Sequence, residues 1–247
     1  TDQLEASGSE LYADKKRAQD FANGFLKICR EVGMALPAGE SASVTYLINP
    51  KSPVKEIASL SGSVIGIVNP RENLITGQKL SVGDHIIGVA SSGLHANGIS
   101  LVIKKALELP EQFLTKLPNG NTLGTEALIP TCSYVALVEA LLKEKINIHA
   151  LLPGTGDGVG KIAFDKRPFT YKIHSWLKVP PIMEYFHRNL SVSLENCLKT
   201  FNWGVGYYIF APKEEIDKIL KIGKEKGYTL LDLGMVEKGA RKVIFEP

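Results

Sequence analysis

A short polar segment between two apolar runs has the residue types needed to bind an anion. It reads Ser-Ser-Gly-Leu-His-Ala-Asn-Gly over residues 91–98, after an apolar run at 85–90 and before a helical pattern that starts at Ile99. Gly93 and Gly98 let main-chain N–H groups approach a ligand without an intervening side chain. The N–H groups at the start of the following helix, together with its dipole, favour phosphate or sulfate. A strand-to-helix turn with polar caps stays the alternative.

The side chains of this segment add neutral hydrogen-bonding groups and one titratable ring. Ser91, Ser92 and Asn97 can each hydrogen-bond an anion. His95 can act as a cationic donor or as a group that transfers a proton, because an imidazole titrates near neutral pH. The segment therefore contains neutral binding groups and a candidate for acid–base chemistry.

A second loop, Gly-Thr-Gly-Asp-Gly-Val-Gly at residues 154–160, is rich in glycine. It lacks the Lys-Ser/Thr ending of a P-loop, and its spacing does not fit the G-x-G-x-x-G dinucleotide fingerprint. Asp157 could hold a magnesium ion through water or only shape the turn, and the sequence leaves both readings open. Thr155, Gly156 and Asp157 are retained as a possible ligand loop.

Asn202 and Glu40 are weaker candidates for ligand contact. Asn202 lies in Phe-Asn-Trp-Gly-Val-Gly at residues 201–206, which suits a ligand contact or a strand that another backbone approaches closely. Glu40 lies in a turn-rich loop, where a lone acid is usually solvated. The five histidines show no H-x-x-x-H spacing, so a zinc site is not indicated. No G-x-S-x-G elbow is present, so a serine hydrolase is not indicated either.

The composition is that of a globular protein. The 247 residues are 44% hydrophobic and 22% charged, which excludes a disordered chain. No apolar stretch reaches the roughly 18 residues that span a bilayer, so no membrane partner is expected. The net charge of +3 is too small to indicate nucleic acid. Cys29, Cys132 and Cys197 are far apart and predict buried free thiols, as expected of a cytoplasmic protein.

Helical and strand patterns alternate along the chain, which predicts an α/β or α+β fold. A helix is expected from Asp14 to a glycine stop at Gly33. Residues 1–13 and 111–130 are predicted to be loops. Strands are predicted at residues 64–68, 85–90, 146–152, 170–173, 206–210, 228–236 and 242–245. Further helices are expected from residue 99, around 134–142, from 181, from 194 and from 212.

These loops, in this order, resemble one enzyme family. The segment 83–100 is similar to the one that opens the C-terminal domain of aminoimidazole ribonucleotide synthetase, the purine-pathway cyclo-ligase. The likeness continues through Pro130-Thr131 and Tyr134, through 179–182 and through 200–206. Upstream, Cys29-Arg30 and Gly39-Glu40 resemble the family's helix and its following Gly-Gly-Glu-Thr-Ala segment. The resemblance covers nearly the whole chain.

The sequence departs from the family pattern in several places. Ser43 replaces an acid, Trp203 replaces a methionine, and the loop at 152–158 aligns poorly with the family's His-x-Thr-Gly-Gly-Gly. The Asp-Gly-Val-Gly-Thr-Lys, Asn-Asp and lysine motifs linked to ATP use are not found at the start of this chain. We therefore expect a divergent, N-terminally truncated member that lacks much of the ATP site.

The resemblance implies ATP-dependent ring closure of formylglycinamidine ribonucleotide, with ATP and Mg²⁺ as cofactors and ADP and phosphate as products. It implies that His95 transfers a proton. The residues it implies for binding substrate or phosphate are Ser91, Ser92, Gly93, Asn97, Asn202, Gly204, Gly206 and Glu40. Glu40 is implied as a polar contact to substrate or metal, and no residue is assigned as a metal ligand.

The resemblance also implies a domain organisation. Residues 1–78 would be the tail of an N-terminal α/β domain that forms a homodimer, and residues 79–247 a C-terminal α/β sandwich. The missing N-terminal segment is a further possible partner. The rival assignments are other superfamily members, namely formylglycinamidine synthetase, selenophosphate synthetase, thiamine-phosphate kinase and the hydrogenase maturation protein. A rival of another class is a non-catalytic protein that binds a phosphate ligand.

Overall fold

A computed structural model describes residues 2–7, 14–37, 39–43 and 57–247 of the chain. It divides into two compact units, Thr1–Asn69 and Pro70–Pro247. The division falls before the expected boundary at residue 78, because residues 70–78 pack with the second unit. The Arg167 guanidinium, for example, donates a hydrogen bond of 2.9 Å to the carbonyl of Gly77.

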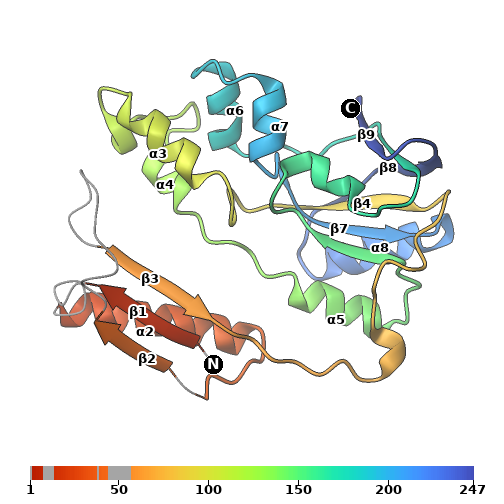
Figure 1. The fold of residues 1–247 in the computed structure, drawn as a ribbon, viewed down its shortest axis with the longest axis horizontal. Coiled ribbons are helices and arrows are strands. Elements are labelled where there is room, and N and C mark those ends of the chain that lie inside the picture. The colour runs from red at the N-terminus through yellow and green to blue at the C-terminus, as the bar shows by residue number, and fades with distance from the viewer. Residues whose placement is uncertain (1, 8–13, 38, 44–56) are drawn as a thin grey trace. The chain divides into compact units, whose positions relative to one another are not determined.

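The described part of the first unit combines a three-stranded sheet with helix α2 (Lys15–Glu31) (Figure 1). Strand β1 (Asp2–Ser7) lies in the middle, parallel to β2 (Gly39–Ser43) and antiparallel to β3 (Ile57–Gly62). Helix α2 (Lys15–Glu31) begins where predicted, because the Asp14 carboxylate accepts from the N–H groups of Lys16 and Arg17. Its predicted stop, Gly33, has a φ of 67°.

Three predictions for the first unit are wrong. Residues 2–7 form the central strand although their polar sequence predicts a loop, because strands on both sides supply hydrogen bonds. Glu40 lies in β2, opposite Gln3, and not in a loop. The apolar run at 64–68 is not a strand. Its Ile65 and Ile67 side chains are 90% and 93% exposed, and the strand lies earlier, in β3.

The second unit is built on a six-stranded sheet, with the order β5-β7-β4-β8-β6-β9. All neighbouring pairs are antiparallel except β6 and β9, which are parallel. The strands are β4 (His85–Ala90), β5 (Ala150–Pro153), β6 (Phe169–Ile173), β7 (Val205–Ala211), β8 (Leu230–Lys238) and β9 (Lys242–Phe245). The α/β, more narrowly α+β, class predicted from the sequence is confirmed.

Helices cover both faces of this sheet (Figure 1). One face packs against α3 (Ile99–Leu107), α4 (Leu123–Ala127), α6 (Pro181–Arg188) and α7 (Leu194–Thr200). The other packs against α5 (Val135–Lys143) and α8 (Ile216–Glu225). Strand β7 shows why both faces are apolar. Tyr208 and Phe210 point into the first core, and Ile209 and Ala211 into the second, because successive side chains alternate across a strand.

Two larger differences from the sequence prediction lie in the second unit. The expected loop at 111–130 contains α4, which the Thr122 hydroxyl caps by accepting from the N–H of Thr125. The strand expected from residue 146 begins at Ala150, because Ile146 and Ile148 are buried in the core beneath α5 without joining the sheet. In the first case the cap at Thr122 begins a helix within a segment whose sequence predicts a loop.

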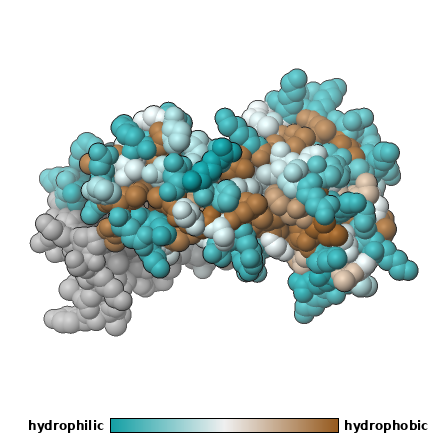
Figure 2. Space-filling model, turned by 90° about the horizontal axis from the view of Figure 1, so that it is seen from above, coloured by the Kyte–Doolittle hydropathy of each residue, from teal (hydrophilic) through white to brown (hydrophobic). Residues whose placement is uncertain are grey.

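The outer side of α3 keeps part of its apolar stripe at the surface. Val102 and Ala106 are fully buried, whereas Ile99, Ile103 and Leu107 are exposed. Figure 2 shows apolar areas of this kind interspersed with hydrophilic side chains in its view. Among the described residues, no helix is both long enough and apolar enough to cross a membrane.

Candidate functional site

The polar segment at 91–98 joins the end of β4 to the start of α3, as predicted. The N–H of Ser91 donates to the carbonyl of Gly204 at 2.9 Å. Among the residues that the structure describes, no main-chain carbonyl accepts from the N–H groups of residues 93–99. We call residues 91–99 the anion loop. Its seven consecutive N–H groups at 93–99 have no main-chain acceptor, and main-chain N–H groups of this kind can bind an oxyanion.

The His95 ring contacts Ser92, near the start of the same loop. Its Nε2 atom lies 3.1 Å from the main-chain N of Ser92 and 3.1 Å from Ser92 Oγ. The Ser92 hydroxyl donates to the carbonyl of Pro130 at 2.7 Å and accepts from the N–H of Cys132 at 3.1 Å. These bonds fix the segment at 130–132 beside the loop, although 38 residues or more separate it from Ser92 in sequence.

The same contacts define the protonation state of His95. A main-chain N–H points at Nε2, so this nitrogen is unprotonated in the neutral ring and the proton is on Nδ1. Burial lowers the pKa of His95 below its ordinary value, because a desolvated imidazolium is disfavoured. His95 is therefore a neutral base at physiological pH. Its backbone is left-handed, with a φ of 58°.

Asn202 is hydrogen-bonded to the backbone of the anion loop. Its side-chain N–H groups donate to the carbonyls of Gly93 at 2.8 Å and Leu94 at 3.2 Å, and its Oδ1 accepts from the N–H of Gly204 at 2.9 Å. The side chain is 3% exposed. The sequence left open a ligand contact or a strand that another backbone approaches closely, and the amide hydrogen bonds of Asn202 are to main-chain groups of the protein. The structure assigns Asn202 to positioning the loop.

Gly204 and Gly206, which the resemblance implies for binding, are closely packed by neighbouring groups. A Cβ on Gly204 would meet the carbonyl of Lys178 at 2.7 Å, and the φ of Gly204 is 104°. A Cβ on Gly206 would collide with the Tyr134 hydroxyl and the His95 ring. Tyr134 in turn donates to the carbonyl of Ala90 at 3.0 Å. The His95 and Tyr134 side chains therefore pack directly against the backbone of Gly206.

Gly206→Ala is expected to lower the free energy of unfolding by about 1–3 kcal/mol, because the added methyl group overpacks the space beneath His95. Gly160→Ala is the matched control. A Cβ there meets nothing within 4 Å, so its effect should stay within about 0.5 kcal/mol. Urea unfolding of both variants measures the difference. Equal losses from the two substitutions would contradict the assigned packing.

The glycine-rich loop lies beside the anion loop, because the Asn97 amide donates to the Thr155 hydroxyl. Gly156, Asp157 and Gly158 all have left-handed backbones, with φ of 63°, 54° and 55°. The Lys161 ammonium lies 3.9 Å from the Cβ position of Gly156. Sequence reasoning gave Lys161 no role. The signal that could have found it is its place just after a glycine-rich turn.

Three further candidate residues have different surroundings. Asp157 is exposed, and Glu40 belongs to the first unit, where its side chain is outside the described structure. The Ser91 hydroxyl is buried within the second unit and has no hydrogen-bond partner there. Among the described residues, no group of three or more His, Cys, Asp or Glu side chains could hold a metal ion.

Cys29 and Cys197 are buried, as predicted, but Cys132 is only partly buried. The prediction for Cys132 is therefore wrong. Its neighbours Thr131 and Val135 are exposed, because the chain runs over the surface between Pro130 and α5. The sulfur lies 3.9 Å from His95 Nε2, which places this thiol at the anion loop.

Two carboxylate–histidine pairs lie around the start of β4, at the end of the strand away from the anion loop. His149 Nδ1 lies 2.8 Å from Asp84 Oδ2, which also accepts from the N–H of Ser81. His85 Nδ1 lies 2.8 Å from Asp232 Oδ2. Sequence reasoning missed both pairs, because their partners are distant in the chain. The two carboxylate–histidine pairs link the start of β4 to β8 and to the segment before β5.

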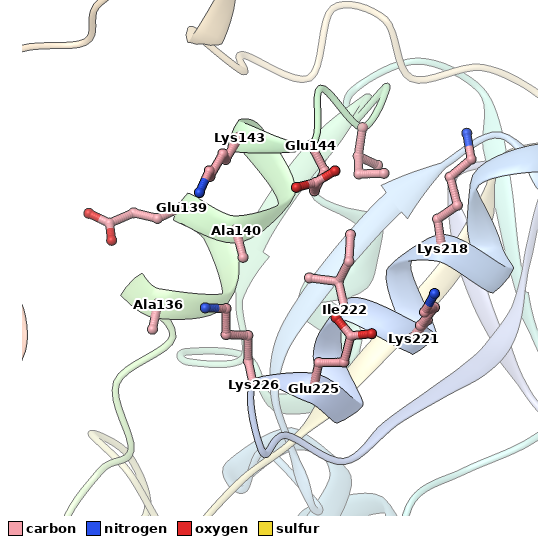
Figure 3. A pocket seen from close by; sticks show the side chains of 11 residues that line it. Ala136, Glu139, Ala140, Lys143, Glu144, Lys218, Lys221, Ile222, Glu225 and Lys226 are labelled. Carbon is pink, nitrogen blue, oxygen red and sulfur yellow. The ribbon is translucent and has the colours of Figure 1, made fainter.

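A groove of about 720 Å³ separates α5 from α8 on the other face of the sheet (Figure 3). None of the candidate site residues lines it. Its charges are of both signs, with Lys143, Lys218, Lys221 and Lys226 alternating with Glu139, Glu144 and Glu225. These opposite charges nearly balance, so we keep the anion loop as the candidate site.

Comparison with known sequences identifies relatives. A family model described as AIR synthase related protein, C-terminal domain, matches residues 81–246. A phosphoribosylformylglycinamidine cyclo-ligase of Methanobrevibacter smithii is 33% identical over 215 residues, which are 86% of this chain and 60% of the relative. One of Neisseria meningitidis serogroup B is 32% identical over 230 residues, 91% of this chain and 64% of the relative. The chain thus spans less than two thirds of these relatives.

Solved structures with less sequence similarity share the fold. A thiamine-monophosphate kinase from Stenotrophomonas maltophilia superposes with a TM-score of 0.61 at 17% identity, covering 99% of this chain and 72% of that one. Hydrogenase maturation protein HypE in complex with ATP gives 0.61 at 16% identity, covering 99% and 68%. PurL complexed with FGAR from T. maritima gives 0.52 at 12% identity, covering 96% and 35%.

Proposed function

The chain belongs to the family of AIR synthase related proteins, and from this premise we propose that it is part of an ATP-dependent cyclo-ligase. The enzyme would close the imidazole ring of formylglycinamidine ribonucleotide and release ADP and phosphate. The relatives named phosphoribosylformylglycinamidine cyclo-ligase support this assignment over the rival superfamily members. The site observation that carries it is the run of N–H groups at 93–99 without main-chain acceptors.

In this proposal the anion loop binds the phosphate of the ribonucleotide. Main-chain N–H groups suit this role because they bind an oxyanion without a permanent charge of their own. Ser91 and Asn97 add hydrogen bonds at the edges of the loop, and the Ser91 hydroxyl has no other partner in the second unit. Lys161, beside Gly156, supplies positive charge from the neighbouring glycine-rich loop, whose Thr155 is already tied to Asn97.

His95 would serve the reaction as a proton acceptor. Ring closure requires that a nitrogen of the substrate lose a proton as it attacks the activated formyl carbon. Nε2 of His95 is unprotonated, and burial keeps it so by lowering its pKa. Taking up the proton requires that the Ser92 N–H be released from this nitrogen. A general base in this position contributes on the order of 10²–10⁴-fold to the rate.

ATP would phosphorylate the formyl oxygen and so create a leaving group. The motifs that the family resemblance links to ATP are not found at the start of this chain, and the described residues form no cluster that fits Mg²⁺. No step of this proposal is therefore routed through a metal held by these residues. The first unit would belong to a dimer-forming N-terminal domain, and the enzyme would act in the cytoplasm as a homodimer.

The complete gene product, incubated with ATP, Mg²⁺ and formylglycinamidine ribonucleotide, tests the proposal. We expect ADP release that depends on the ribonucleotide, with aminoimidazole ribonucleotide formed in equal amount. ADP release that instead depends on thiamine phosphate or selenide would identify one of the rival enzymes. Ribonucleotide binding without ADP release would identify a non-catalytic binding protein.

A further inference from the structure

We propose that Cys132 is a reactive thiol, which small disulfides modify with His95 as the proton acceptor. The structure carries this inference through three groups of Cys132 and Ser92 that meet at one nitrogen of His95. Cys132 Sγ, the Ser92 hydroxyl and the Ser92 N–H all lie within hydrogen-bonding distance of His95 Nε2. The proposal concerns the thiol chemistry of the chain itself and goes beyond ring closure.

The direction of proton transfer follows from the protonation state of the ring. Nε2 is the unprotonated nitrogen of a neutral imidazole, so it can accept the thiol proton but has none to give. Taking up this proton requires that the Ser92 N–H be released from Nε2, which then becomes a donor that can face the thiolate. A thiolate beside an imidazolium is a stabilised nucleophile, and the thiolate is the reactive form of cysteine.

The chemical step is a balanced thiol–disulfide exchange. The Cys132 proton moves to His95 Nε2, and the sulfur attacks one sulfur atom of a small disulfide such as oxidised glutathione. A new disulfide joins Cys132 to half of the reagent, and the other half leaves as a thiolate. Cys132 is oxidised and the leaving thiol is reduced, so the reagent is the only co-reactant.

The position of Cys132 links its modification to ligand binding. Its N–H donates to the Ser92 hydroxyl, and its sulfur lies at the ring that closes the anion loop. A bulky group on this sulfur would occupy the space beside His95 and Ser92. We therefore expect modification to obstruct the loop, and an anion bound in the loop to protect the thiol.

The other two cysteines provide internal controls. Cys29 and Cys197 are free thiols as well, but both are buried. Burial raises the pKa of the Cys197 thiol to about 11, which leaves little thiolate at neutral pH. Neither has a histidine nitrogen among its described hydrogen bonds. The three thiols therefore differ in exposure and in the presence of a base.

The test is reaction of the folded chain with dithiobis-nitrobenzoate, followed by release of the coloured thiolate and by peptide mass spectrometry. We expect one fast site, Cys132, reacting at least about tenfold faster than Cys29 and Cys197. Cys132→Ser should remove the fast phase, and Cys29→Ser should keep it. His95→Asn should slow Cys132 at least about fivefold. A fast phase located at Cys29 or Cys197, or a Cys132 rate unchanged by His95→Asn, would overturn the proposal.

Inorganic phosphate in the reaction separates this inference from the proposed function. Slower labelling of Cys132 with increasing phosphate supports both the reactive thiol and the anion loop. Fast, His95-dependent labelling that phosphate does not change supports the thiol proposal alone and counts against phosphate binding at the loop.

Discussion

Asn202→Ala is expected to lower the free energy of unfolding by about 2–4 kcal/mol, because it leaves several buried groups unpaired. The amide donates to the carbonyls of Gly93 and Leu94 and accepts from the N–H of Gly204. A hydrogen-bonded side chain that is 3% exposed has no water to replace these partners. Chemical denaturation of the variant and the parent measures the loss.

Two further substitutions make this prediction specific. Asn202→Asp keeps the shape of the side chain but replaces its donors with an oxygen that faces two carbonyls, so it should destabilise at least as much as Asn202→Ala. Asn196→Ala, on the exposed side of α7, should change stability by no more than about 0.5 kcal/mol. Equal stability of Asn202→Asp and the parent would show that the side chain fills space and does not brace the loop.

His95→Asn is expected to reduce the turnover of the complete gene product by about a hundredfold, the low end of the range for loss of a general base. Asparagine is the suitable replacement, because it tolerates the left-handed backbone at φ 58° better than alanine does. Steady-state kinetics should show the loss mainly in kcat. A loss confined to KM would indicate that His95 only shapes the loop.

The pH profile provides a second readout of the same prediction. Burial lowers the pKa of His95, so the ring stays neutral to a lower pH than an exposed histidine of pKa about 6.5. Activity that requires the neutral ring should therefore fall only on the acid side of that value as protonation removes the base. The His95→Asn variant should lack this acid limb. An unchanged acid limb in the variant would assign the titration to another group.

The parts of the fold that could be predicted are those where local sequence and tertiary packing agree. Strand β4 has the predicted bounds, because its apolar run is buried on both faces of the sheet. The loop that follows ends at Gly98, whose φ of 95° requires a glycine, and α3 begins at the predicted residue. Ser193 caps α7 as its type and position predict.

The parts that could not be predicted depend on partners distant in the sequence. Strand β1 has a polar sequence and is a strand because it lies between β2 and β3. The run at 64–68 has strand-forming residues but no neighbouring strand. In the site, composition indicated which loops could bind an anion. Composition could not show that Asn97 contacts Thr155 or that Asn202 is hydrogen-bonded to the loop backbone, because the partners in these contacts are far apart in sequence.

Titration of the ¹⁵N-labelled chain with inorganic phosphate, followed by the amide resonances, tests the anion loop directly. We expect saturable shifts in the N–H signals of residues 93–99, with smaller changes near Thr155 and none in the groove between α5 and α8. Shifts confined to that groove, or no saturable shift of the loop amides, would contradict this expectation.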